Sequence, residues 1–190
     1  MQQLPSFPGS RYAIPQPAAW AVRGLSLRHA CDEDLPWLQM LYSQSREAEL
    51  APVPWPAAIK AAFLESQFAL QHRHFVQAGT GTTWWIVCQK SAGGTIQPIG
   101  RLYLAEGVHT VTVVDICLLG THQSQGVGTA LLCQVMNEAA RAGRSVSLHV
   151  AHGNPGALRL YQRLGFAVQE DVGSHLRMQW LPPTASSVLS

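Results

Sequence analysis

The chain has 190 residues, a length that fits one domain with a sizeable core. Hydrophobic residues make up 47% and charged residues 13% of it, a composition that excludes charge-driven disorder. Its 13 basic and 11 acidic residues are scattered and give a net charge of +2, so no basic run could neutralise successive phosphates of a nucleic acid. We therefore expect a globular domain without a nucleic-acid partner.

Cysteines, histidines and apolar stretches exclude further classes. The four cysteines lack the paired spacing of a zinc site or a redox loop, and the eight histidines form no ligand-spaced cluster, so no metal is predicted. No stretch approaches the roughly 20 apolar residues of a membrane-spanning helix. The N-terminus also lacks the basic start and apolar centre of a secretory signal. These features predict a cytoplasmic protein with reduced thiols and no membrane partner.

The chain divides into a short leader, one domain and a tail. Prolines at positions 5, 8, 15 and 17 mark residues 1–24 as a loose, proline-rich leader. Residues 25–181 show neither an internal repeat nor a shift in amino-acid composition, and we expect them to form a single domain. Residues 182–190 are expected to be a flexible tail.

The domain opens with a strand and two helices. Residues 25–29 alternate apolar and polar as a half-buried strand does, and Asp32 or Asp34 can cap the helix that follows. Three prolines between positions 51 and 56 end that helix. A second helix is expected to run to His74, with an apolar face formed by Ile59, Phe63, Leu64 and Phe68.

Strands dominate the second half of the domain. Three strand-like runs at 84–90, 96–105 and 108–119 predict an antiparallel meander. A glycine-rich turn then leads into a helix at 125–142, which ends before Gly143. The remaining expected elements are a strand at 145–150, a short helix opening at Asn154 and Pro155, and a hairpin of 166–170 with 174–180.

The turn before the third helix, Gln123-Ser124-Gln125-Gly126-Val127-Gly128, suits an anion. The first backbone N–H groups of a helix have no intrahelical partner, so a phosphate placed there meets donors already pointing at it. A Cβ at Gly126 or Gly128 would crowd a pyrophosphate or forbid the turn's backbone angles, although a plain tight turn would also use these glycines. The Rossmann and Walker patterns are both incomplete here, which disfavours dinucleotide binding and nucleotide hydrolysis.

This turn resembles the Q/R-x-x-G-x-G/A loop of the GNAT superfamily of N-acetyltransferases. A second stretch resembles that superfamily's other signature, through Asn154, Ala157, Tyr161, Gly165 and Phe166. The order of strands and helices from Leu25 to Trp180 is similar as well. The resemblance implies an α/β (α+β) fold, with a mixed, mostly antiparallel central sheet of about seven strands flanked by about four helices.

The resemblance further implies an acyl-CoA-dependent N-acyltransferase, with acetyl-CoA as acyl donor and a primary amine as acceptor. A bulge would part the central strand from its neighbour, and its backbone would then pair with the pantetheine arm as an added strand. Asn154 is equally placed to be a plain helix cap. The implied cofactor-binding residues are Ile116, Leu118, Gln123, Ser124, Gln125, Gly126, Val127, Gly128, Thr129 and Asn154.

Two residues are candidates for catalysis. The resemblance makes Tyr161 the general acid that protonates the departing CoA thiolate, whereas its helical spacing alone would place it in the core. Asp115 on the central strand is the candidate base, although a buried Asp bonded to backbone would show the same pattern. The alternatives for the base are Glu47, Glu49, His149 and His152.

Gln123 and Gln125 stand where many relatives carry Arg or Lys, so pyrophosphate binding would depend on backbone donors and affinity could be modest. The segment from Arg46 to Phe75, with the acids Glu47 and Glu49, is expected to select the acceptor, and a small-molecule amine is preferred over a protein lysine or N-terminus. A non-catalytic acyl-CoA sensor or scaffold is the alternative function. Homodimers are common among such folds, so a homodimer is a candidate state.

Overall fold

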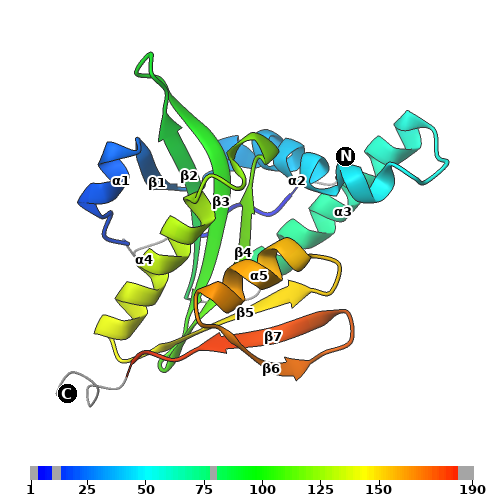
Figure 1. Ribbon diagram of the computed structural model, residues 1–190. Coiled ribbons are helices and arrows are strands. Elements are labelled where there is room, and N and C mark those ends of the chain that lie inside the picture. The colour runs from blue at the N-terminus through cyan, green and yellow to red at the C-terminus, as the bar shows by residue number, and fades with distance from the viewer. Residues whose placement is uncertain (1–3, 10–13, 78–80, 184–190) are drawn as a thin grey trace.

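The computed structural model describes residues 4–9, 14–77 and 81–183, which form a seven-stranded sheet flanked by helices (Figure 1). The sheet order is β1-β2-β3-β4-β5-β7-β6, and every neighbouring pair is antiparallel except β4 with β5. The strands are β1 Leu25–His29, β2 Thr82–Lys90, β3 Ile96–Glu106, β4 Thr110–Leu118, β5 Ser145–Ala151, β6 Ala167–Asp171 and β7 His175–Trp180. The helices are α1 Ala18–Val22, α2 Leu35–Leu50, α3 Ala57–Gln77, α4 Val127–Arg141 and α5 Pro155–Arg163.

The predicted mixed sheet is confirmed, and the strand alternation explains how it is covered. Successive side chains of a strand point to opposite faces. In β2, Trp85 and Val87 join a core with residues of α1, α4 and α5, while Ile86 and Cys88 join a core with α2 and α3. The sheet therefore separates two layers of helices. Within the described residues no helix is both long and apolar enough to cross a bilayer.

The expected loose leader is wrong for the part of it that the structure describes. Residues 18–22 form α1, and the Trp20 side chain is only 4% exposed because it packs into the larger core. Gln16 exchanges two hydrogen bonds with the backbone of Leu27, and Gln134 of α4 donates to the carbonyl of Pro15. The buried Trp20 and these hydrogen bonds together hold the segment, and its proline content did not indicate this. Most of the expected tail, residues 184–190, lies outside the described residues.

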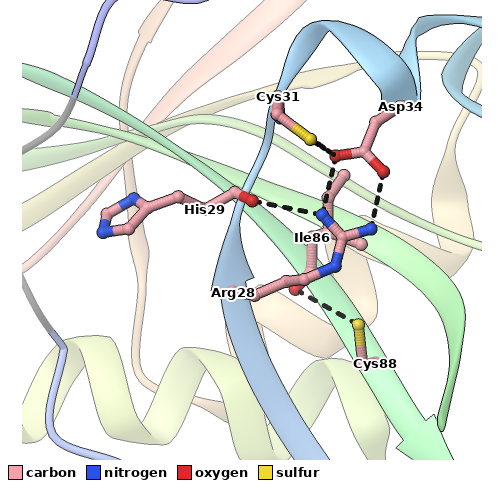
Figure 2. Close-up of polar contacts among 6 residues, drawn as sticks. All are labelled: Arg28, His29, Cys31, Asp34, Ile86 and Cys88. Atoms are coloured by element: carbon pink, nitrogen blue, oxygen red, sulfur yellow. Dashed lines mark hydrogen bonds and ion pairs between the residues drawn. The ribbon is translucent and has the colours of Figure 1, made fainter.

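The corner between β1 and α2 uses its acidic residues differently from the prediction (Figure 2). The Asp34 carboxylate forms two hydrogen bonds with the Arg28 guanidinium, at 2.6 and 2.7 Å, and accepts another from the Cys31 backbone. It makes no capping bond to α2. Hydrogen bonding to Glu33, burial and Asp34 raise the pKa of Cys31 to about 11, so its thiol stays protonated at neutral pH.

The first half of α3 projects past the sheet (Figure 1), which corrects the predicted apolar face of this helix. Phe68 is buried in the smaller core and Leu64 packs against it, as expected. Ile59 and Phe63 are instead 53% and 38% exposed. The Phe63 ring packs edge-on against Trp55, with ring centroids 5.4 Å apart, so an aromatic pair lies at the surface of the α2–α3 connection.

Candidate functional site

β4 and β5 part after a bulge, as the resemblance implied. Their parallel pairing runs from Thr110 with Ser145 to Val113 with Leu148, and β4 then continues to Leu118 without a β5 partner among the described residues. On the other side, Tyr103 and Leu104 of β3 face Asp115 and Val113, so Val114 is the extra residue. Backbone groups of β4 beyond the bulge are therefore open to an added strand, and Ile116 and Leu118 lie on this stretch.

The turn that follows β4 ends at an uncapped helix. Gly126 precedes α4 with a φ of 75°, and Ser124 has a φ of 58°. The first helical hydrogen bond runs from Ala130 N to Gly126 O at 3.0 Å, so the N–H groups of residues 127–129 lack an intrahelical partner. Among the described residues, no side chain caps them. Four backbone donors in sequence, starting at Gly126, can bind an anion at this point.

The two glutamines of the turn hold the loop rather than point their amides outward. Gln123 donates to the carbonyl of Leu118 at 2.9 Å, and Gln125 donates to the carbonyl of Thr121 at 2.6 Å. The only arginine that contacts this turn in the described part of the chain is Arg23, whose guanidinium reaches the carbonyls of Gln125 and Gly126. No sequence pattern pointed to Arg23, because about a hundred residues separate it from the turn.

The two glycines of the turn are constrained differently, so their alanine variants should differ in stability. At Gly126 the backbone is left-handed, with a φ of +75°, and an alanine there would have to adopt this conformation at a cost of about 1–2 kcal/mol. A Cβ at Gly128 would meet Leu160 and Leu118 at ordinary distances of 3.7 and 3.9 Å. We expect Gly126→Ala to lower the free energy of unfolding in urea by that amount, and Gly128→Ala to change it by less than about 0.5 kcal/mol or to raise it. Equal losses would contradict this distinction.

Asn154 begins α5 and is a helix cap, as predicted. Its side-chain oxygen accepts a hydrogen bond from the backbone N–H of Ala157 at 3.0 Å, and Pro155 occupies the first helical position. The Asn154 side chain is exposed at the same end of α5. A contact between Asn154 and a cofactor stays a prediction.

Tyr161 extends from α5 into the larger core. Its side chain is 6% exposed and its ring lies 5.9 Å from that of Phe166. The hydroxyl has no hydrogen-bond partner among the described residues, yet it is not one of the fully buried orphan atoms, Trp84 Nε1 and Arg144 Nε. Burial, together with the negative charge of Asp115, raises the pKa of Tyr161 to about 12. The two predicted catalytic residues therefore lie within electrostatic range of each other.

Asp115 is held in an ion pair that sequence reasoning missed. Its Oδ2 accepts from Arg101 Nε at 2.6 Å, and Arg101, only 3% exposed, also donates to Gln71 of α3 at 2.9 Å. The Asp115 side chain itself is 22% exposed, and its Oδ1 has no partner among the described residues. One carboxylate oxygen is thus used by the protein and the other is open to a ligand.

Two surface hollows of about 410 Å³ each lie elsewhere. One is bordered by α2, α3 and Leu4, and the other by the β1–α2 corner with Phe7 and Trp84. Neither is lined by a residue of β4, β5, α4 or α5. We place the candidate site at the parting of β4 and β5, because the open backbone, the uncapped helix and the two predicted catalytic groups converge there. No cluster of three metal-ligating side chains occurs within residues 4–9, 14–77 and 81–183.

Known proteins share this arrangement. A model of the Acetyltransferase (GNAT) family matches residues 39–166. Similar solved structures include PaiA N-acetyltransferase from Thermoplasma acidophilum in complex with coenzyme A, with 17% identity, a TM-score of 0.61, and coverage of 83% of this chain and 98% of that one. A search of curated protein sequences found no match.

Two further structures widen the comparison. Spermidine N-acetyltransferase from Vibrio cholerae, in complex with CoA and spermine, has 19% identity, a TM-score of 0.54, and coverage of 83% of this chain and 95% of that one. The ribosomal-protein-S18-alanine N-acetyltransferase from Escherichia coli has 18% identity, a TM-score of 0.54, and coverage of 87% and 99%. Identities this low establish a common fold. Because the family match extends from Gln39 to Phe166 and includes both signature motifs, this chain belongs to the acetyltransferase (GNAT) family.

Proposed function

We propose that this protein transfers the acetyl group of acetyl-CoA to a primary amine, with a small molecule as the preferred acceptor. One observation carries the proposal: the end of β4 that has no β5 partner leads through a single turn to the uncapped N-terminus of α4. An extended pantetheine arm and a pyrophosphate are joined in the same order in CoA. A ligand of this shape would satisfy strand-edge and helix-end donors together.

The proposed reaction uses Tyr161 and Asp115 on either side of the thioester. The amine nitrogen attacks the thioester carbonyl carbon, and the carbon–sulfur bond then breaks. Tyr161, which its raised pKa keeps protonated at neutral pH, gives its proton to the departing thiolate. The nitrogen loses its second proton to solvent as the amide forms, and Tyr161 takes a proton back from solvent. Asp115 Oδ1 would accept the ammonium proton before the attack, and we retain this role as a prediction.

The acceptor would approach from the side of α2 and α3. Gln71 of α3 contacts Arg101, which in turn contacts Asp115, so α3 borders the proposed reaction centre. Of the two predicted acidic residues, Glu49 pairs with Arg46 at 3.0 Å while Glu47 is exposed. Glu47 can therefore attract a cationic amine. The polyamine complex and the ribosomal-protein enzyme among the similar folds support testing both small amines and peptide N-termini.

Thermal unfolding tests the cofactor first. A ligand that binds only the folded state at about 100 times its Kd stabilises by about 2.7 kcal/mol, which for a chain of this size raises Tm by about 5–10 °C. We expect this shift with acetyl-CoA and CoA, and none with ATP. A panel of amines, with released CoA thiol as readout, then identifies the acceptor class. An unchanged Tm at millimolar acetyl-CoA would contradict the proposal, whereas binding without turnover would indicate a sensor or scaffold.

A further inference from the structure

The anion-binding turn has no permanent positive charge of its own. From Gly120 to Thr129 the sequence holds neither Lys nor Arg, and His122 is its one titratable side chain. The amides of Gln123 and Gln125 are already bonded to loop carbonyls. Backbone N–H groups can orient a pyrophosphate, but they contribute only partial charge, and charge-assisted hydrogen bonds are roughly twice as strong as neutral ones.

Arg23 brings a guanidinium to this turn from the other end of the sequence. Its Nη2 lies 2.6 Å from the carbonyl oxygen of Gln125, and its Nη1 lies 3.4 Å from that of Gly126. The same nitrogens lie 3.7 and 3.8 Å from the point where a Cβ on Gly126 would project. The guanidinium therefore lies beside the space that is open over the turn because Gly126 has no side chain.

One buried side chain and two hydrogen bonds to the backbone position Arg23. Trp20, three residues earlier, is buried in the larger core. Gln89 of β2 donates to the carbonyl of Arg23 at 3.2 Å, and the backbone of Lys90 donates to that of Gly24 at 2.8 Å. Gly24 itself has a φ of 65°, which allows the chain to turn from α1 into β1. The Arg23 side chain thus starts from an anchored point.

No salt bridge compensates the charge of Arg23 in the part of the chain that the structure describes. Within the described ranges no carboxylate pairs with it, and its guanidinium is exposed. A guanidinium has five N–H donors in a planar fork, of which the two loop carbonyls use only part. An exposed, anchored cation beside uncapped helix donors has the properties of an anion ligand. Arginines that do pair with a carboxylate include Arg28, Arg46, Arg101, Arg141, Arg144 and Arg177.

We propose that Arg23 contacts the pyrophosphate of the acyl donor and supplies the positive charge that the turn lacks. The inference rests on the proposed function, since it assigns a further residue to the same acetyl-CoA site. It also changes the expectation of modest affinity, because the missing loop cation is replaced by one from the segment before β1. α1 then has a role in the site, through the position of Arg23.

The test compares Arg23→Gln and Arg23→Lys with Arg141→Gln, a control at the far end of α4. Binding of acetyl-CoA and of S-acetylpantetheine, which has no phosphate, is measured by calorimetry. We expect Arg23→Gln to weaken acetyl-CoA binding by about 10- to 100-fold, with Arg23→Lys losing less because it keeps the charge. S-acetylpantetheine binding and the Arg141→Gln protein should stay within about twofold of wild type.

The salt dependence of binding distinguishes an ionic contact between Arg23 and the ligand from a purely structural role of Arg23 in holding the turn. The wild-type advantage over Arg23→Gln should shrink between about 50 and 500 mM salt, because screening weakens an exposed ion contact. An equal ratio at both salt concentrations, or an equal loss for acetyl-CoA and S-acetylpantetheine, would overturn the role of Arg23. Wild-type protein that binds no acetyl-CoA would instead overturn the proposed function itself.

Discussion

Replacing Tyr161 by Phe is expected to lower kcat by about 10²- to 10⁴-fold, the usual contribution of a positioned general acid. The ring stays in its packed place beside Phe166, and the lost hydroxyl has no partner among the described residues, so Tm should change little. Steady-state kinetics with acetyl-CoA and an accepted amine measure kcat, and calorimetry checks that acetyl-CoA still binds.

The pH dependence of kcat provides a second test of the same assignment. A general acid must be protonated, and the pKa of Tyr161 is raised to about 12, chiefly by burial. Tyr161 should therefore cause no loss of kcat between about pH 7 and 10, where an ordinary tyrosine with a pKa of about 10 would begin to lose its proton.

Tyr42→Phe, in the smaller core, is the matched control for Tyr161→Phe and should keep wild-type kcat. If the kcat of Tyr161→Phe lay within threefold of the wild-type kcat, the activation free energy would have changed by about 1 kcal/mol or less, and the acid role would be contradicted.

Replacing Asp115 by Asn is expected to lower the free energy of unfolding by about 3–5 kcal/mol, because it leaves the Arg101 guanidinium buried without an anion. Urea unfolding followed by fluorescence measures the loss. Arg46→Gln, which breaks an exposed pair with Glu49, serves as the control and should cost less than about 1 kcal/mol. A loss of similar size in both variants would contradict the structural importance of the Arg101–Asp115 pair.

A double variant separates the structural role of Asp115 from its predicted role as base. Arg101→Met with Asp115→Leu removes both charges, and apolar replacement of a buried pair is often neutral or stabilising. We expect this protein to recover most of the stability that Asp115→Asn loses, while kcat stays about 10²-fold or more below wild type. A folded double variant with wild-type kcat would exclude Asp115 as the base.

Much of the fold followed from contacts between neighbours in the chain. The strand at 25–29, the cap of α5 by Asn154 and the hairpin around Gly173 depend on alternation, capping and turn chemistry within a few residues. The helix that begins at the glycine turn was also expected. Where a prediction went wrong, as for the capping role of Asp34 or the face of α3, a distant partner or its absence decided the outcome.

The sequence by itself determined the family and the location of the turn that we propose binds the pyrophosphate, since both depend on short motifs with fixed spacing. Only the tertiary structure showed that Arg23 contacts that turn and that Arg101 pairs with Asp115. Residues 23 and 125 meet because Trp20 packs into the same core as α4, and no local pattern encodes such a meeting. Long-range pairing of charges depends on which elements become neighbours, and the fold of the whole chain decides this.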